Sequence, residues 1–336
     1  MKRLPLTLAC WIYDRTLALF EGTVRPEGID LIYLPLWIQE IFYRMLRYKE
    51  FDASELSFGA YVASLFSDER PFIAIPVFPS RHFRHSGIYI NRESGIREPR
   101  DLIGKKVGVP EYRQTACVWI KGILSDFYDV KPDSVYYFRG PLESTESRRK
   151  YFTVLAETDN LPRYKKINIT PIPPGKNLSQ MLLDGEIDAL YSAMTPSAFT
   201  NRPDKVKRLF DNHREVEIEY FKKTRIFPIM HVIVIRRDVY EKNRWVAKSL
   251  YKAFEEAKQI AFEKLKTATG TLHCALPWLF DHYEETVRIM GEDYWSYGLR
   301  KNLHTLETFI RYMEEQGLIP AKISPENLFA PEVIDT

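Results

Sequence analysis

The sequence predicts an α/β fold divided into two domains. Short apolar stretches alternate with stretches of helical periodicity along most of the chain, which is the pattern of strands connected by helices. The strand-like stretches are almost continuously apolar, as expected when helices cover both faces of a mostly parallel sheet. At 336 residues the chain exceeds the size at which a single hydrophobic core keeps growing, so two domains are expected.

The first ninety residues are expected to alternate between strands and helices. Leu4–Cys10 and Ile29–Leu34 are predicted strands. Asp14 is predicted to cap a short helix over Arg15–Phe20, and Trp37–Lys49 has the three-and-four spacing of an amphipathic helix. The remaining elements expected in this part are a strand at Ala53–Leu56, a helix at Tyr61–Phe66, and strands at Phe72–Phe78 and Gly87–Asn91.

A polar, turn-forming stretch at Arg92–Arg100 indicates a domain boundary. The elements expected beyond it are strands at Lys106–Val109, Val135–Phe138, Ile187–Tyr191 and Ile229–Ile235, and helices at Gln114–Tyr128, Leu178–Leu183 and Asn243 to about Lys266. The chain is expected to be mainly helical from there to Gln316. Residues 140–176, rich in proline, charge and threonine, give no assignable element.

Composition excludes several classes of protein. Net charge is only +3, with acids and bases interspersed, so a nucleic-acid-binding surface is not expected. Three scattered cysteines favour a reducing compartment over a disulfide framework. The apolar run Leu4–Ala9 is too short for a secretory leader, and no stretch is long enough to span a membrane, so we expect a cytoplasmic protein.

One segment concentrates the residues suited to binding a small carboxylate. Arg81, Arg84 and His85 follow a predicted strand in FPSRHFRHS. The next strand leads into GVPEYRQT, where Thr115 lies near the start of a helix. A guanidinium binds a carboxylate through two parallel hydrogen bonds, and a helix N-terminus offers free N–H groups. The segment therefore predicts a carboxylate pocket.

Two groups of motifs also resemble known families. DLIGKKVGVP and MLLDGEIDAL resemble the second lobe of type II periplasmic-binding-protein-like folds. That resemblance implies two lobes, residues 1–97 with 225–336 and residues 98–224, with a ligand cleft between them. FPSRHFRHSGIYIN, GVPEYRQTACVWIKGIL and FPIMHVIVIRRDVY are similar to segments of the 4,5-dihydroxyphthalate decarboxylase family.

The second resemblance implies a carboxy-lyase of aromatic catabolism that needs no cofactor and no metal. Its substrate would be a dihydroxylated aromatic dicarboxylate. Arg81 and Arg84 would anchor a carboxylate, His85 or His231 would act at the ring hydroxyls, and Glu111 would be the acid, with acid and base assignments left open. The further substrate-binding candidates are Tyr112, Thr115, Thr195 and Asp14.

Each candidate also has a structural interpretation. Arg81 and Arg84 could belong to a solvated basic loop, and His231, beside an apolar run, could be a core histidine. Thr195 could cap the helix that Pro196 begins, and Asp14 could be only a helix cap. His82 and His85 have a spacing that metal ligands use, but no carboxylate–histidine set completes such a site.

Two other functions use the same fold. A non-enzymatic solute-binding protein would hold a small aromatic carboxylate without chemistry, but the leader expected for export is missing. A ligand-sensing domain of a transcription regulator would need a DNA-binding module, for which a first strand at Leu4 leaves no room. The sequence leaves a homo-oligomer open and does not identify the substrate.

Overall fold

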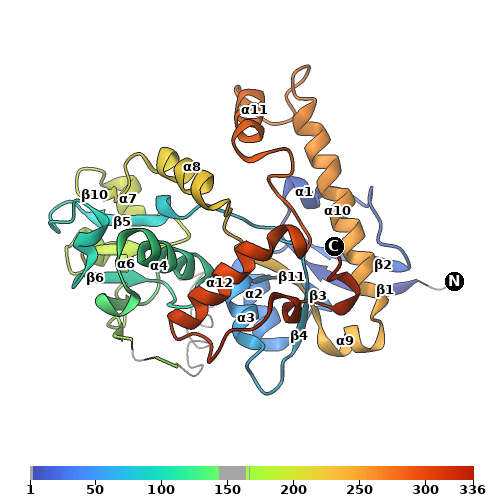
Figure 1. Cartoon of the computed structure of the whole chain (residues 1–336), viewed down its shortest axis with the longest axis horizontal. Coiled ribbons are helices and arrows are strands. Elements are labelled where there is room, and N and C mark those ends of the chain that lie inside the picture. Colours follow the sequence, from blue (N-terminus) through green and yellow to red (C-terminus); the bar gives the residue numbers. More distant parts are fainter. Residues whose placement is uncertain (1–2, 144–163, 166) are drawn as a thin grey trace. The chain divides into compact units, whose positions relative to one another are not determined.

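A computed structural model describes residues 3–143, 164–165 and 167–336 (Figure 1). Contacts between residues divide the chain into two compact units. The first comprises Met1–Arg81, Phe221–Leu306 and Ile323–Thr336, and the second comprises His82–Tyr220 and Glu307–Lys322. The chain therefore leaves the first unit twice, after Arg81 and after Leu306, and returns to it each time. No helix in the described part of the chain is long and apolar enough to cross a membrane.

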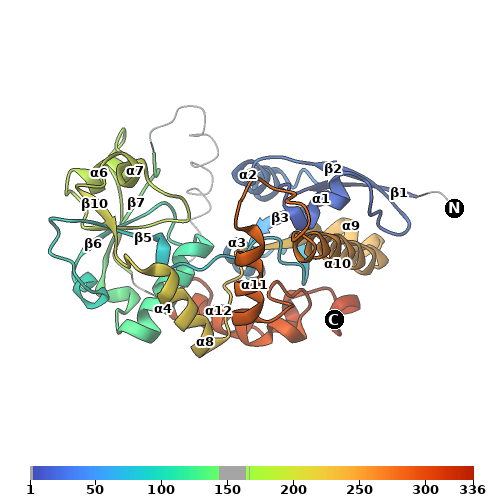
Figure 2. The same ribbon diagram turned by 90° about the horizontal axis from the view of Figure 1, so that it is seen from above.

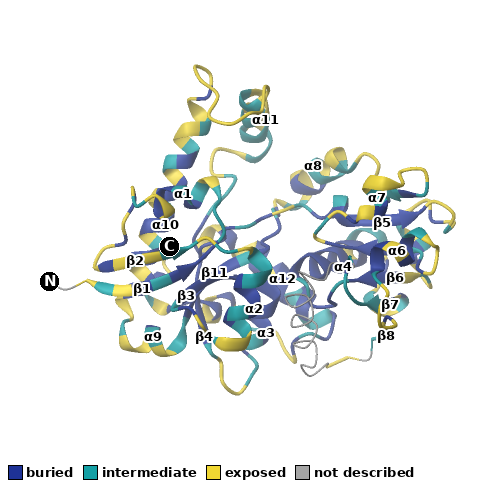
Figure 3. Ribbon diagram, turned by 180° about the vertical axis from the view of Figure 1, so that it is seen from behind, coloured by how far each residue is buried: buried dark blue, intermediate teal, exposed yellow. Residues whose placement is uncertain are grey.

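The sheet of the first unit has the strand order β2-β1-β3-β11-β4. Its strands are β1 (Leu4–Ala9), β2 (Ile29–Leu34), β3 (Ala53–Ser57), β4 (Phe72–Ile75) and β11 (His231–Arg236). β1 runs parallel to β2 and β3, whereas β11 is antiparallel to β3 and β4. The apolar run of β11 is buried at the middle of the sheet, as a strand covered on both faces requires (Figure 3).

The helices of the first unit are α1 (Asp14–Phe20), α2 (Ile38–Tyr48), α3 (Phe58–Ser64), α9 (Arg237–Lys242), α10 (Trp245–Lys266) and α11 (Leu279–Met290). They differ in how much of their surface is buried: α3 is buried on almost every side, α10 along one stripe, and α11 has no buried residue. On α10 the buried residues Leu250, Phe254 and Ala257 recur at three-and-four spacing. α1 and α9 both contact α10 (Figure 2). This periodicity explains why the sequence predicted the long helix almost to its ends.

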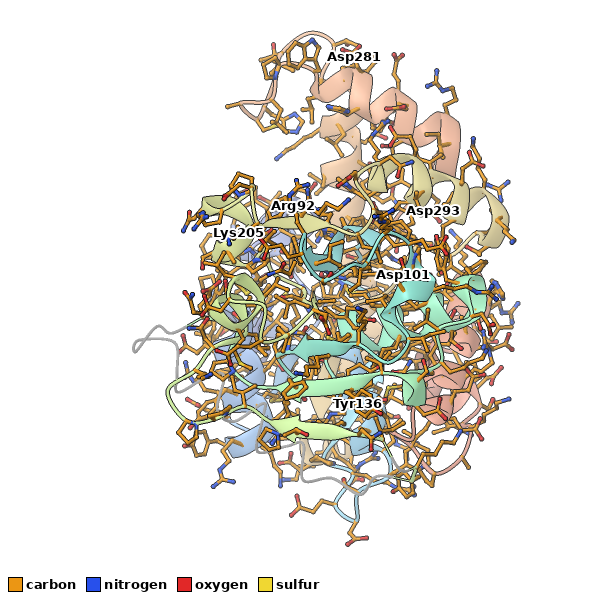
Figure 4. All side chains as sticks on the ribbon, turned by 90° about the vertical axis from the view of Figure 1, so that its left-hand side faces the viewer. Arg92, Asp101, Tyr136, Lys205, Asp281 and Asp293 are labelled. Carbon is orange, nitrogen blue, oxygen red and sulfur yellow. The ribbon has the colours of Figure 1, made fainter. Side chains whose placement is uncertain are left out.

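The sheet of the second unit has the strand order β10-β5-β9-β6-β7-β8. Its strands are β5 (Ile88–Asn91), β6 (Lys106–Val109), β7 (Tyr136–Arg139), β8 (Ile169–Pro171), β9 (Ala189–Tyr191) and β10 (Val206–Arg208). β9, β6, β7 and β8 are mutually parallel, and β5 is antiparallel to β9 and β10. At the β5–β10 edge the labelled Arg92 and Lys205 lie side by side, where the Arg92 amide donates to the Lys205 carbonyl (Figure 4).

The helices of this unit are α4 (Thr115–Tyr128), α6 (Leu178–Leu183), α7 (Ser197–Asn201), most of α8 (His213–Thr224) and most of α12 (Leu303–Glu315). Three-residue helices include η1 (His85–Gly87). Every residue of α4 from Thr115 to Ser125 is buried. Trp119 of α4 packs against Phe309 and Tyr312 of α12, so a helix from the end of the chain covers α4.

The observed units differ from the predicted ranges 1–97 with 225–336 and 98–224 in two long segments and in the short stretch 221–224, which belongs to the first unit. Residues 82–97 carry β5, which pairs with β9 and β10 of the second sheet. Residues 307–322 carry most of α12, which packs on α4. Both associations join segments that are distant in sequence, and local periodicity does not reveal such partners.

Several predicted element ends were wrong. Asp14 is the first residue of α1 and not its cap, because Tyr13 takes the N-cap position and the Thr16 hydroxyl accepts from the Tyr13 amide at 2.9 Å. β4 ends at Ile75 because Pro76 lacks the N–H that a longer ladder needs. α3 begins at Phe58, three residues before the predicted start. Most of the unassigned stretch 140–176, namely 144–163 and 166, lies outside the described residues.

Candidate functional site

Polar side chains gather at the carboxyl ends of the parallel strands in each unit. In the first unit these strands are β1, β2 and β3, and β11 begins at the same edge because His231 lies opposite Ser57 in the antiparallel ladder. In the second unit the strands are β6, β7 and β9. Ligands of open α/β sheets bind outside the carboxyl ends of the strands, so these two edges hold the candidate residues.

At the edge of the first sheet, Glu55 of β3 forms a buried pair with His231. His231 Nδ1 and Glu55 Oε1 are 2.5 Å apart, and the Tyr13 hydroxyl donates to the same oxygen at 2.6 Å. The other oxygen, Oε2, accepts from the Trp11 amide at 3.1 Å and faces the Cys10 thiol at 3.5 Å. The Glu55 side chain is fully buried, whereas 16% of the His231 side chain is exposed.

The surroundings of Glu55 keep its carboxylate ionised. Burial alone would raise the pKa of Glu55, but the positive charge of His231 and the hydrogen bonds from His231, Tyr13 and the Trp11 amide outweigh it, so the pKa is lowered. Burial, reinforced by the charge of Glu55, raises the pKa of the Tyr13 hydroxyl and of the Cys10 thiol. Tyr13 and Cys10 are therefore neutral hydrogen-bond donors to a charged carboxylate.

Arg81, predicted to anchor a carboxylate, is engaged by the protein itself. Its Nη1 donates to the Phe227 carbonyl at 2.9 Å, and its Nη2 donates to the Ser296 carbonyl at 2.7 Å and to Asn302 Oδ1. The side chain is buried, which lowers the pKa of Arg81 to about 9. These contacts connect three separate segments of the first unit and favour a structural role.

Arg84 lies at the carboxyl edge of the second sheet. Its Nη1 donates to the carbonyl of Ala193, just beyond β9, at a long 3.4 Å. Burial lowers the pKa of Arg84 to about 10, against the opposing charges of Cys117, Glu217 and Tyr89. A bound carboxylate would offset part of the desolvation of this buried guanidinium, as an anion-binding residue requires.

The start of α4 adds N–H groups to this edge. Thr115 is the first residue of the helix, Gln114 is its N-cap, and no cap hydrogen bond is formed by the Gln114 side chain. The first amides of a helix lack partners within the helix and carry a partial positive charge. Gly87 of η1 lies so close to the segment after β9 that a Cβ there would be 2.7 Å from the Ser192 carbonyl oxygen. The Arg84 segment and the end of β9 are thus held together.

Glu111 and Tyr112 lie in the loop between β6 and α4, and both are buried. Glu111 Oε1 pairs with Arg113 Nη2 at 3.5 Å. The Tyr112 carbonyl accepts from Lys121 Nζ at 2.7 Å, and the same ammonium lies 3.0 Å from the centre of the Tyr112 ring. Tyr112 and Lys121 thereby fix the loop that carries Glu111.

The remaining candidates have mainly structural surroundings. His85 packs edge-on against Phe210 and Tyr220, and burial lowers its pKa to about 4. Its Nδ1 is buried without a hydrogen-bond partner, which favours a neutral core histidine. Thr195 accepts from the Tyr89 hydroxyl at 3.3 Å and lies before Pro196, the N-cap of α7. Asp14 pairs with Arg15 at 2.9 Å on the surface.

Sequence reasoning missed four residues of these two edges: Glu55, Tyr13, Arg113 and Lys121. Two of them carried a visible signal. Glu55 is a carboxylate inside a short apolar strand, and Lys121 is a cation inside an almost wholly apolar helix. Charged residues at such positions are rarely buried unless they have partners. Within the described residues no group of three or more His, Cys, Asp or Glu side chains could hold a metal ion.

The chain resembles two curated decarboxylases. No family model matches it. It is 34% identical over 336 residues to the 4,5-dihydroxyphthalate decarboxylase of Comamonas testosteroni. The aligned region covers 100% of this chain and 99% of the relative. It is 35% identical over 222 residues to the 4,5-dihydroxyphthalate decarboxylase of Pseudomonas putida, covering 66% of this chain and 83% of the relative.

Solved structures identify the fold. The periplasmic aliphatic sulphonate-binding protein SsuA of Escherichia coli matches with a TM-score of 0.51 and 13% identity, covering 99% of both chains. The Candida albicans CA3427 gene product, which exhibits the generic periplasmic-binding-protein fold, matches with a TM-score of 0.51 and 12% identity over 95% of this chain and 92% of that chain. The predicted fold class is confirmed.

Proposed function

Because the chain belongs to the 4,5-dihydroxyphthalate decarboxylase family, we propose that it removes one carboxyl group from 4,5-dihydroxyphthalate or a closely similar dihydroxylated aromatic dicarboxylate. The chain is a carboxy-lyase. The observation that carries the choice of substrate is the 34% identity to the Comamonas testosteroni enzyme across the whole of both chains. This substrate offers two adjacent carboxylates and two ring hydroxyls, each of which needs its own partner in the protein.

The proposed reaction uses the ring as the electron sink and needs no cofactor. A base takes the proton of the hydroxyl para to the departing carboxylate, and electron density moves to the carbon that bears this carboxylate. That carbon accepts a proton, aromaticity is lost for one step, and carbon dioxide leaves as the ring is restored. The protein then has to supply a carboxylate anchor and groups that move two protons.

In the second unit, we assign carboxylate binding to Arg84 and to the first turn of α4 at Thr115. The buried guanidinium and the helix N-terminus both stabilise negative charge, and both lie at the carboxyl edge of the sheet. Arg113, absent from the sequence-based set, is buried next to Glu111. We assign proton transfer in this unit to Glu111, and Tyr112 and Thr195 remain proposed contacts of the aromatic ring.

In the first unit, we assign proton transfer to His231. It is the partly exposed member of the pair with Glu55, and it lies at the carboxyl edge of its sheet. Its surroundings differ from those of His85, whose pKa is lowered to about 4 by burial and which is therefore a weak base at neutral pH. Replacing His231 with Asn should lower kcat by roughly 10²- to 10⁴-fold, the usual contribution of one positioned acid or base.

A substrate series tests the proposal. Purified protein should convert 4,5-dihydroxyphthalate to the dihydroxybenzoate with loss of one carboxyl group, and it should leave phthalate unchanged because phthalate has no hydroxyl to donate electron density. Conversion of phthalate at a comparable rate would contradict the electron-sink mechanism. Absence of product from every dihydroxylated dicarboxylate would contradict the proposed function.

The alternative function is a solute-binding protein for a small aromatic carboxylate. It is supported by the fold shared with sulphonate-binding proteins. Tight binding of 4,5-dihydroxyphthalate with no turnover would favour this alternative. The family relationship favours the enzyme.

We also propose that the enzyme acts in the cytoplasm. Cys10, Cys117 and Cys274 are all free thiols, which suits a reducing compartment. Fractionation of source cells should recover the activity with cytoplasmic markers, and recovery with periplasmic markers would contradict this assignment.

A further inference from the structure

Glu55 is a charged residue at a position where an apolar side chain would be expected. It lies on β3 between β1 and β11, with Ile233 of β11 opposite it in the ladder. Its side chain has no exposed surface. A carboxylate in such a place is costly unless hydrogen bonds replace its hydration. Its presence therefore needs a reason beyond packing.

Both oxygens of Glu55 have donors. Oε1 has His231 Nδ1 at 2.5 Å and the Tyr13 hydroxyl at 2.6 Å, and Oε2 has the Trp11 amide at 3.1 Å. Tyr13 is held in turn by the guanidinium of Arg15, which lies 4.2 Å from the centre of its ring. The carboxylate is thus ionised and oriented by donors from two segments of the first unit, the loop after β1 and the start of β11.

This arrangement determines the protonation of His231. An ionised carboxylate only accepts hydrogen bonds, so the nitrogen facing it must carry a proton. Nδ1 is therefore protonated in both charge states of the ring, and Nε2 is the nitrogen that gains and loses a proton. Phe42, edge-on to the imidazole at 4.9 Å, restrains the plane of the ring.

We propose that Glu55 is a positioning residue that holds His231 in the Nδ1–H tautomer and thereby makes Nε2 the proton-exchanging atom. Glu55 itself contacts no reacting group. The consequence for turnover rests on the proposed function, which makes His231 the proton-transfer residue. The tautomer follows from the contacts alone and is measurable without substrate.

The test is ¹⁵N NMR of histidine-labelled protein in the absence of substrate, with the His231 signals assigned by their loss in His231→Asn. At a pH where the ring is neutral, wild-type His231 should show a protonated Nδ1 and an unprotonated Nε2. In Glu55→Gln the amide can either donate or accept, so the two tautomers should become mixed. Asp52→Asn is the matched control: the Asp52 carboxylate lies at the same sheet but accepts from Thr7 and pairs with Arg236, not with His231.

Activity gives a second readout. Glu55→Gln should lower kcat by roughly 10²-fold or more, because the wrong tautomer removes a positioned acid or base, while KM changes little. Glu55→Asp, which keeps the charge, should recover part of this loss. Asp52→Asn should retain wild-type kcat.

The outcomes separate this inference from the proposed function. Wild-type protein with its proton on Nε2 would overturn the inference, whether or not the variants fold. An unchanged tautomer in a folded Glu55→Gln protein would overturn it as well. The expected tautomers together with no turnover of any substrate by wild-type protein would leave the role of Glu55 intact and contradict the proposed function.

Discussion

At the scale of single residues, burial has opposite consequences for Glu55 and His85. Hydrogen bonds and the charge of His231 outweigh the desolvation of Glu55, so the charged form is retained and its pKa falls. His85 meets two aromatic rings, and desolvation is the only cause acting on it, so the neutral form is retained. The first arrangement retains a buried charge beside His231, the residue proposed for proton transfer, and the second contributes to the core.

The surroundings of His85 predict a specific pH dependence of stability. In the unfolded chain a histidine binds a proton below about pH 6.5, whereas in the folded protein the pKa of His85 is about 4. Between these values the unfolded state binds more protons, so the free energy of unfolding falls as the pH falls. Between pH 7 and pH 5, His85→Phe should remove about 2 kcal/mol of this fall.

Urea denaturation at pH 7, 6 and 5 measures this effect. Replacing the exposed His273 with Gln is the control and should leave the pH dependence unchanged. A His85→Phe protein whose stability falls with pH as steeply as that of the wild type would contradict a buried neutral His85.

Arg84 carries the binding prediction. Arg84→Ala should weaken the binding of an aromatic dicarboxylate by roughly 2–5 kcal/mol, the cost of leaving a buried charge without its partner. Calorimetry with phthalate, which the proposed chemistry leaves intact, measures this change. Arg92→Ala removes an exposed guanidinium from the same unit and should not alter the affinity. Equal affinities of a folded Arg84→Ala protein and the wild type would reject the assignment.

The sequence predicted part of the candidate site. Arg84, Glu111 and Thr115 were singled out because they follow strands or begin helices, and His231 because it precedes an apolar strand. All four lie at carboxyl edges of the sheets, and their roles stay proposals. Arg81 was singled out on the same grounds, but its guanidinium is used by carbonyls of distant segments. Spacing along the chain does not show which distant partners a side chain will meet. Glu55 was visible as a carboxylate in an apolar strand, but its partners His231 and Tyr13 could not be foreseen from the sequence.

At the scale of elements, α4 begins at the edge proposed to bind a carboxylate and packs along its length in the core of the second unit. α12 closes over α4 at Gly122, where a Cβ would lie 2.1 Å from the ring of Tyr312. The Tyr312 hydroxyl donates to Asp126 at 2.7 Å, and the Gln316 amide donates to the Val118 carbonyl at 2.9 Å. Glycine in the middle of α4 is therefore explained by close approach of the two helices.

The substitution Gly122→Ala tests whether helix propensity or the packing of α12 on α4 determines stability at this position. Alanine should stabilise an isolated helix by about 1 kcal/mol relative to glycine, but overpacking in a core costs roughly 1–3 kcal/mol. Because the clash is with a ring held on both sides, we expect a net loss of stability in thermal unfolding. Gly270→Ala, at a position with no atom within 4 Å of the added Cβ, should be nearly neutral. A stabilised Gly122→Ala protein would contradict the packing of α12 on α4.

Sequence patterns predicted elements well where periodicity is strong. β2, β6 and α6 have the predicted bounds, and α10 begins two residues after its predicted start. α8 was missed because HREVEIEYFKKT is polar on most of its surface and has no clear apolar stripe. β10 and α7 are too short for a pattern to repeat.

At the scale of the whole molecule, the chain order follows from strand pairing between distant segments. β11 lies between β3 and β4 in the first sheet, although the whole of the second sheet is formed between β4 and β11 along the chain. The resemblance to a known fold predicted this return. Residue patterns alone did not, and they placed neither β5 nor α12 in the unit to which it belongs.

The proposed mechanism, which uses no cofactor, makes a prediction for the purified enzyme. The initial rate of turnover should be unchanged after dialysis against a chelator, because the proposed mechanism uses only the ring and protein side chains to move electrons and protons. The measurement is the initial rate before and after dialysis, with and without added divalent ions. Activity lost on dialysis and restored by a divalent ion would contradict the mechanism.

The most direct test of the account follows the fate of the carboxyl carbon. Protein purified without added cofactors is incubated in D₂O with 4,5-dihydroxyphthalate labelled with ¹³C in its carboxyl groups, and the mixture is monitored by NMR. The account predicts labelled carbon dioxide and dihydroxybenzoate in equal amounts, with one deuterium at the carbon that lost the carboxylate. Saturable binding of the labelled compound without release of carbon dioxide would contradict the account and identify the protein as a receptor for it.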